Sequence, residues 1–237
     1  MAANKENKET IILAIETSTD VCSAALSSNG VTIDSILETG ARMQTARLAP
    51  MIGELLERNG FCMKDCSAVA VSSGPGSYTG LRVGVSMAKG LCFGAGIPLI
   101  GVGTLDILAA QGIALSQAAA DYVIPMIDAR RMEVYQALYD GAGTRIGDIS
   151  PKILDGSSYS GLPIDKQLLF CGNGCFKFES IIERKGSLFV PCNPSADYMS
   201  RLSYENFING IFEDVAYMEP FYLKDFAIGI SKKKILG

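Results

Sequence analysis

The chain has 237 residues, of which 48% are hydrophobic, a formal net charge of −4 and no histidine. This length suits one large domain or two lobes sharing a waist, with enough apolar residues for a sizeable core. The absence of histidine excludes Ser-His-Asp and Cys-His catalysis and every histidine-ligated metal site. The net negative charge argues against direct binding to the phosphate backbone of nucleic acid, although the chain could join a complex in which a partner holds the RNA.

The N-terminal segment and the cysteines indicate a cellular compartment. Residues 1–9 are polar and charged, so they lack the apolar core of a secretory signal peptide. No apolar run approaches the length of a membrane span. Seven cysteines without a signal are expected to be reduced thiols. Cys62–Cys66 and Cys171–Cys175 have zinc-like spacing, but the pairs lie far apart along the chain. We therefore expect a cytoplasmic protein with a disordered or flexible tail over 1–9 and no bound metal.

The first half of the chain predicts three strands followed by alternating helices and strands. Residues 10–16 form an apolar run rich in β-branched side chains, which predicts a buried strand ending in Glu16. Residues 21–27 alternate as a second strand, and Asn29-Gly30 favours a tight hairpin turn into a third over 31–37. The following helix, strand, helix and strand are expected at about 45–58, 68–72, 81–93 and 98–102.

The second half repeats this plan. Residues 122–128 predict another buried strand that ends in an acid, Asp128. Strands are then expected over 133–139, 144–149 and 168–171, a loop over 151–166, and helices over 176–184 and 196–209. The fold class is therefore α/β, with duplicated lobes over 10–103 and 104–237 and the helix at 195–210 packing back on the first. Glu16 and Asp128 would end equivalent strands on two sides of a cleft.

Two motifs beside this cleft have the chemistry of a phosphate site. An acid followed by hydroxyls, Glu16-Thr17-Ser18, can position Mg²⁺-bound water and donate to phosphate. The glycine-rich loop Ser73–Gly80 precedes a helix N-terminus, which favours anions, although it lacks the P-loop lysine. A polar strand end and a tight turn explain the same residues equally simply. The nucleotide or phosphate candidates are Glu16, Thr17, Ser18, Gly74, Gly76, Ser77 and Asp128.

Asp128 also precedes two arginines, Arg130 and Arg131. An acid beside arginine fits an active-site pair, but a surface hairpin with a weak salt bridge is the favoured interpretation.

Two helices of the first lobe have the composition of an interface. Residues 45–58 and 81–93 mix small and apolar side chains, which allow close packing with helices of another subunit. The alternative is that both helices pack only on their own sheet. The interface candidates are Leu48, Met51, Ile52, Leu55, Leu81, Arg82, Val85, Ser86 and Lys89.

Together these motifs resemble the TsaB (YeaZ) family, whose members have the actin-like (ASKHA, ribonuclease H-like) ATPase fold. The most specific stretch is Ser73–Gly84, followed by Ala88-Lys89-Gly90. Four further motifs support it in the family's order: Ala14–Thr19, Ile127–Arg131, Pro194–Ala196 and Pro220–Leu223. The resemblance extends from about residue 11 to residue 224.

The resemblance implies a non-catalytic subunit of the complex that forms N6-threonylcarbamoyladenosine (t6A) in tRNA, beside the anticodon. It implies a heterodimer with the transferase TsaD, binding of the P-loop ATPase TsaE, a homodimer when alone, and tRNA contact only through the complex. TsaD carries metal-binding histidines where this chain has Thr104 and Leu108. No cofactor is therefore expected for the chain alone, with ATP or ADP and Mg²⁺ left open at the partner interface.

A second hypothesis is a nucleotide-dependent kinase or ATPase of the same fold. Glu16, Asp128 and the loop Gly74–Gly80 motivate it, but Gly172–Gly174 is its sole candidate for an adenosine loop. A peptidase, suggested by the older glycoprotease (M22) name of the wider family, lacks histidine and a recognisable Ser-Lys dyad. No residue is predicted to be catalytic.

Overall fold

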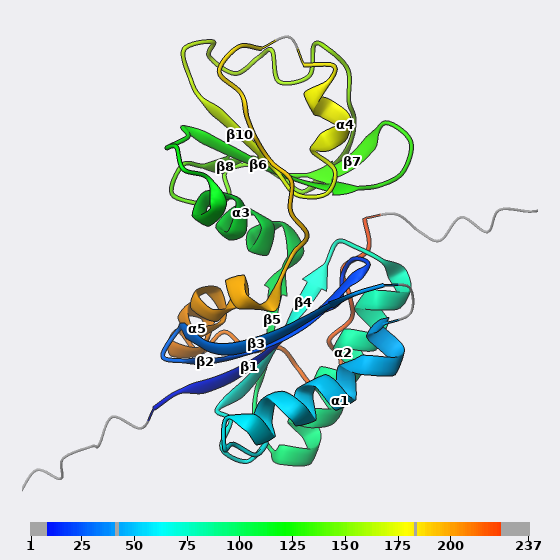
Figure 1. Cartoon of the computed structure of the whole chain (residues 1–237), viewed down its shortest axis with the longest axis vertical. Coiled ribbons are helices and arrows are strands. Elements are labelled where there is room, and N and C mark those ends of the chain that lie inside the picture. The colour runs from blue at the N-terminus through cyan, green and yellow to red at the C-terminus, as the bar shows by residue number, and fades with distance from the viewer. Residues whose placement is uncertain (1–8, 41–42, 183, 224–237) are drawn as a thin grey trace, which may run out of the picture.

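The structure of the chain, a computed structural model, describes residues 9–40, 43–182 and 184–223. Two lobes are stacked along the long axis of the molecule (Figure 1). Of the tail expected over 1–9, only Glu9 falls among the described residues. No helix in these ranges has the combination of length and hydropathy that a transmembrane span requires.

The first lobe follows the predicted order of elements. Its elements are β1 (Ile11–Glu16), β2 (Val21–Ser28), β3 (Val31–Thr39), α1 (Met43–Arg58), β4 (Ala68–Gly74), α2 (Tyr78–Ala95) and β5 (Leu99–Gly103). The sheet order is β3-β2-β1-β4-β5, with the first three strands antiparallel and β1, β4 and β5 parallel. Every residue of β1 is buried, because helices cover both faces of the sheet.

The second lobe has the same topology. After α3 (Thr104–Leu115), its strands are β6 (Tyr122–Asp128), β7 (Glu133–Gln136), β8 (Tyr139–Asp140), β9 (Ser150–Ile153), β10 (Leu168–Cys171) and β11 (Leu188–Val190). The order β9-β7-β6-β10-β11 repeats β3-β2-β1-β4-β5, including the parallel and antiparallel pairings. This duplication of a three-strand meander and two parallel strands confirms the predicted actin-like fold.

Three expectations for the second lobe were wrong. The third meander strand is β9 at 150–153 rather than 144–149, because Ile146 and Gly147 turn back to donate to the Leu138 carbonyl. The strand expected over 133–139 is divided into β7 and β8. The helix expected over 176–184 is a single turn, α4 (Phe176–Glu179), after which Ile181 and Ile182 both donate to the Phe178 carbonyl.

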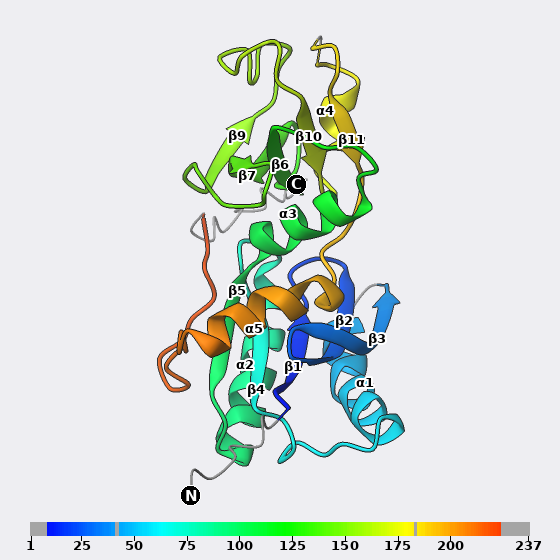
Figure 2. The ribbon, with the colours of Figure 1, turned by 90° about the vertical axis from the view of Figure 1, so that its left-hand side faces the viewer.

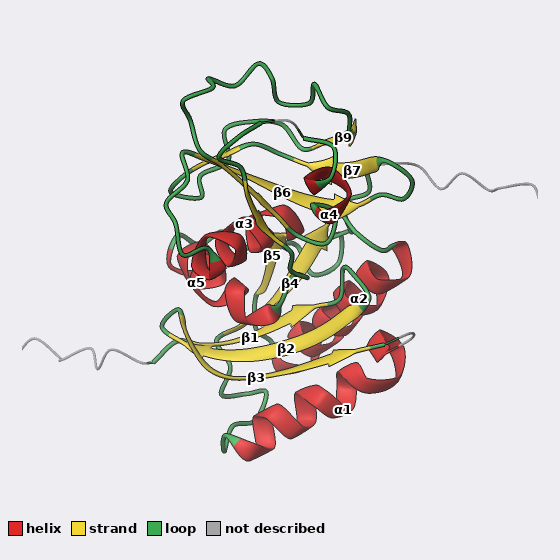
Figure 3. Cartoon of the chain, turned by 45° about the horizontal axis from the view of Figure 1, so that its top comes forward, coloured by secondary structure: helices red, strands yellow, loops and turns green. Residues whose placement is uncertain are grey.

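Helices from both halves of the chain lie between the lobes. The helix α3 packs on β6 and β10, and the 3₁₀ helix η1 (Ala196–Met199) packs on β1 and β2. The helix α5 (Ser200–Ile208) lies against β1 and β5, on the face of the first sheet opposite α1 and α2 (Figures 1 and 2). In Figure 3, α1 lies below β3, and α2 lies above α1 and passes behind the first three strands. The first lobe therefore leaves α1 and α2 on its outer side.

The last described segment, residues 211–223, forms what we call the C-terminal strap. Glu213 N donates to the Leu99 carbonyl, and Phe221 N donates to the Ser73 carbonyl. Lys89 Nζ donates to the Ala216 and Met218 carbonyls at 2.9 and 3.2 Å. The strap thus runs from β5 along α2 and rises to the space between the lobes (Figure 2).

Candidate functional site

A cavity of about 650 Å³ lies between the lobes. The first lobe contributes the turn after β1 and the loop before α2, and the second contributes the end of β6 and the turn that follows it. This volume is in the range of small-molecule sites. The cavity is lined by Ser18, Thr19, Asp20, Pro75, Gly76, Ser77, Tyr78, Thr79, Ile127, Asp128, Ala129, Arg130, Tyr135, Asn173, Tyr222 and Leu223.

Directly behind this cavity, β1 ends in a buried carboxyl group. Glu16 is fully buried, and its Oε1 accepts a hydrogen bond from Ser18 N at 2.5 Å. Its Oε2 and the Ser18 hydroxyl are buried without a hydrogen bond of normal geometry. Burial raises the pKa of Glu16 to about 7, although the nearby Ser18 and Ser72 moderate the shift. The carboxyl group therefore titrates near neutral pH.

The glycine-rich loop packs tightly on the turn after β1. A Cβ atom at Gly76 would lie 2.4 Å from the Ser18 carbonyl oxygen, and one at Gly80 would lie 2.0 Å from the Thr17 carbonyl oxygen. Thr17 Oγ1 donates to the Gly80 carbonyl at 2.8 Å, and Ser77 N donates to the Ser18 carbonyl at 2.7 Å. Close packing explains these glycines without a ligand, and it joins the turn and the loop into one rigid unit.

The N-terminus of α2 faces the cavity. Ser77 is the N-cap and accepts a hydrogen bond from Gly80 N. Next to it, the rings of Tyr78 and Tyr222 lie 5.0 Å apart between centroids. Arg82 lies 3.9 Å from the Tyr78 ring centroid, and its Nε donates to the Tyr222 hydroxyl at 3.3 Å. The helix end thus places a positive dipole and an arginine-supported tyrosine pair at one wall.

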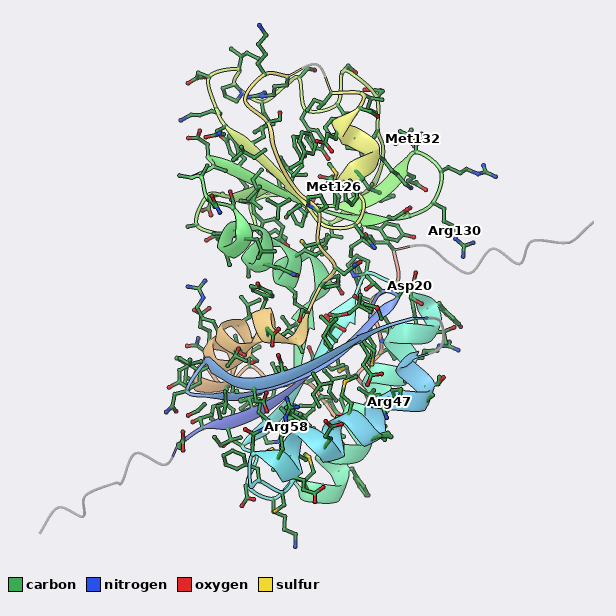
Figure 4. All side chains as sticks on the ribbon, viewed as in Figure 1. Asp20, Arg47, Arg58, Met126, Arg130 and Met132 are labelled. Carbon is green, nitrogen blue, oxygen red and sulfur yellow. The ribbon has the colours of Figure 1, made fainter. Side chains whose placement is uncertain are left out.

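The second-lobe wall is built around Asp128. Its Oδ1 accepts from Arg130 N at 2.6 Å and forms an ion pair with Lys177, and its backbone N donates to Asn173 Oδ1. Arg130 and Arg131 both have positive φ, 72° and 49°. In Figure 4, Arg130 reaches the rim of the cleft above Asp20 of the other lobe. The hairpin lies at the surface, as the favoured interpretation has it, but the salt bridge of Asp128 is with Lys177 and not with an adjacent arginine.

The predicted phosphate residues converge from both lobes. Ser18, Gly76, Ser77 and Asp128 line the cavity, whereas Glu16, Thr17 and Gly74 lie behind it. From the expected adenosine loop, only Asn173 reaches the cavity. Sequence reasoning missed Tyr78, Tyr135 and Tyr222 as lining residues. Tyr78 sits inside the glycine-rich motif and could have been found, but Tyr222 arrives on a distant strap.

Six of the predicted interface residues lie in the core of the first lobe. Their side chains are at most 4% exposed, because the apolar faces of α1 and α2 pack on the sheet. For these six residues, the structure shows the packing on the lobe's own sheet that was the alternative to an interface. Arg82 and Ser86 are exposed, and Lys89 is half-buried beneath the strap. The six buried residues are Leu48, Met51, Ile52, Leu55, Leu81 and Val85.

The two positions that the family resemblance matches to the metal histidines of TsaD lie inside the protein. Thr104 and Leu108 are both fully buried at the start of α3, and Leu108 belongs to the core formed with β6 and β10. Leucine offers no donor atom, so these residues do not fit a metal. Within the described ranges, no group of three Cys, Asp or Glu residues is arranged to hold an ion.

Comparisons with known proteins agree with this architecture. Residues 38–218 match the family model described as TsaD, tRNA N6-adenosine threonylcarbamoyltransferase. The tRNA threonylcarbamoyladenosine biosynthesis protein TsaB of Escherichia coli is 34% identical, over 95% of this chain and 98% of that protein. TsaB of Haemophilus influenzae is 31% identical, over 95% and 97%. The solved structure of YeaZ from Pseudomonas aeruginosa is 29% identical with a TM-score of 0.75, over 90% of this chain and all of that one.

These full-length matches agree with the motif series of the sequence and with the duplicated topology. The two TsaB matches cover 95% of this chain, so they include both lobes and the glycine-rich loop before α2. The chain therefore belongs to the TsaB (YeaZ) family and is a homologue of proteins involved in t6A biosynthesis in tRNA.

Proposed function

We propose that this chain is an accessory subunit that binds TsaD in the t6A complex and does not transfer the threonylcarbamoyl group itself. The observation that carries the proposal is a face of α1 and α2 that is exposed in the described part of the chain. The buried Thr104 and Leu108 support it from the other side, because they supply no metal ligands for the transfer. TsaE would bind the resulting heterodimer.

On the outward side of the two helices, small residues and Phe93 form what we call the helix face, and exposed charged residues, among them Glu54, Glu57 and Arg82, lie beside them. Its spacing of three and four residues places each set on one side of its helix. Small side chains let helices of another protein approach closely, and Phe93, 85% exposed, supplies an aromatic anchor. The helix face comprises Ala46, Ala49, Pro50 and Gly53 of α1 and Ser86, Gly90, Phe93 and Gly94 of α2.

Gly90 offers a direct test of this surface. A Cβ atom added at Gly90 meets no atom within 4 Å, so Gly90→Arg should leave the fold intact and obstruct only a partner. Gly161, on a loop of the second lobe, is equally open and gives the matched control Gly161→Arg. We expect Gly90→Arg to abolish co-purification with TsaD and the stimulation of t6A synthesis, while Gly161→Arg preserves both. Normal TsaD binding by Gly90→Arg would refute the proposed surface.

The kinase or ATPase hypothesis gains no specific observation. Asp128 Oδ1 is engaged by Lys177 and by its own turn, and these contacts compete with Mg²⁺-bound water for that oxygen. The pKa of Glu16 near 7 leaves that group partly neutral at physiological pH. An adenosine loop would have to approach a ligand closely, but Gly172 packs instead against the Met126 carbonyl.

A further inference from the structure

Tyr78 and Tyr222 form an aromatic surface at the cleft that the proposed binding of TsaD does not use. Tyr78 is flanked by the Arg82 guanidinium at 3.9 Å and by the Tyr222 ring at 5.0 Å. The hydrogen bond from Arg82 Nε fixes the Tyr222 hydroxyl. Both tyrosines also line the cavity. The pair is thus a positioned aromatic wall that opens onto a space of about 650 Å³.

The facing wall supplies groups that suit the rest of a nucleotide. Tyr135, Arg130 and Asn173 reach the cavity from the second lobe. Within the described residues, Arg130 forms no ion pair, and only its backbone N contacts Asp128. Asp128 pairs with Lys177, so Asp20 is the acid of the lining that forms no ion pair with another described residue. A phosphate would therefore lie beside Arg130 and away from Asp20.

We propose that the cleft binds one unpaired nucleotide of an RNA strand, with its base against Tyr222 and its phosphate beside Arg130. Stacking on tyrosine accepts any base, and an arginine without an ion pair supplies the anion contact. The acidic charge of the whole chain argues against broad backbone binding but permits a single-nucleotide contact. This goes beyond the proposed function, which leaves tRNA to the partner. The choice of tRNA as the RNA is the one step that rests on that function.

The probe is a labelled anticodon stem-loop RNA, followed by fluorescence anisotropy with the full chain and with its TsaD complex. A fully paired RNA duplex tests the need for an unpaired nucleotide. Tyr222→Leu should weaken stem-loop binding roughly 5- to 100-fold. The matched control is Tyr217→Leu on the same strap, where the side chain is 82% exposed and outside the cavity. That control should bind like the unaltered chain.

Two further variants separate stacking from loss of structure. Tyr222→Phe keeps the ring and loses only the hydroxyl that Arg82 contacts, so its affinity should remain within about threefold. Arg130→Gln should weaken binding and lower the salt dependence by about one counterion. Thermal unfolding of each variant verifies that it is folded.

Several results would overturn the inference. One is equal binding by Tyr222→Leu and the unaltered chain, and another is equal loss in Tyr217→Leu. Free AMP binding as tightly as the stem-loop, with the same dependence on Tyr222, would replace RNA by a mononucleotide. If the chain supports t6A synthesis but does not bind the stem-loop, the RNA site is refuted and the proposed function is not. A chain that fails to bind TsaD defeats the proposed function instead.

Discussion

The buried carboxyl group of Glu16 should make the stability of this protein fall as pH rises from about 4.5 to about 7. Its pKa lies near 7 in the folded chain against an ordinary 4.5, because burial disfavours the carboxylate. The folded state therefore retains a proton that the unfolded chain releases between these pH values. Each pKa unit corresponds to about 1.4 kcal/mol, so the full loss above neutral pH is about 3 kcal/mol. Below about pH 4.5 the carboxyl group contributes no such loss.

Glu16→Gln removes this titration and keeps an oxygen that accepts from Ser18 N. Urea unfolding at about pH 5 and about pH 8 measures the free energy of unfolding for both chains. The unaltered chain should lose about 2.5 kcal/mol more than the variant between these pH values, because part of the full loss has already occurred at pH 5. Comparing the change with pH, rather than stability at one pH, cancels any fixed cost of the buried amide. Glu57→Gln, at an exposed position of α1, is the control and should follow the unaltered chain. Identical pH slopes for Glu16→Gln and the unaltered chain would refute the reasoning.

Two further predictions concern the packing of the first lobe. Gly80→Ala should destabilise the chain by about 1–3 kcal/mol in urea unfolding, because its Cβ would lie 2.0 Å from the Thr17 carbonyl oxygen. Gly53→Ala, which meets no atom within 4 Å, should be neutral or slightly stabilising, and equal effects at both glycines would contradict the close packing. Leu81→Asp should unfold the lobe rather than dissociate a folded dimer, because Leu81 is fully buried. Sedimentation and circular dichroism distinguish these outcomes. The control is Ser86→Asp, at an exposed position, which should remain folded. A folded, monomeric Leu81→Asp variant would contradict the burial of Leu81 and indicate that it lies at the surface.

Local patterns were sufficient to predict most of the first lobe. The run 10–16 is apolar because β1 is buried on both faces, and Asn29-Gly30 forms the expected hairpin turn. The helix α3 was missed because it lies between the lobes, so its apolar residues show little periodicity. An amphipathic pattern identifies the apolar face of α1 or α2, but that face packs on the lobe's own sheet. The small, outward residues carry no comparable signal.

The cleft shows a different limit of local patterns. Glu16 ends β1, and the glycine-rich loop follows the neighbouring parallel strand β4, whereas Asp128 ends the equivalent strand of the second sheet. Their convergence at the cleft could therefore be predicted from the duplicated order of elements. The contact between Arg82 and Tyr222 joins residues 140 positions apart. It depends on the path of the strap over α2, which no spacing in the sequence indicates.

We propose that this chain assists TsaD through the helix face without catalysing the transfer. The most direct measurement is t6A formation in a mixture of TsaD, TsaE, threonylcarbamoyl-adenylate and tRNA, with and without this chain. We predict that the chain alone forms no t6A, that its addition to the mixture restores synthesis, and that Gly90→Arg does not. The same t6A yield with and without the chain, or t6A formed by the chain alone, would contradict the account.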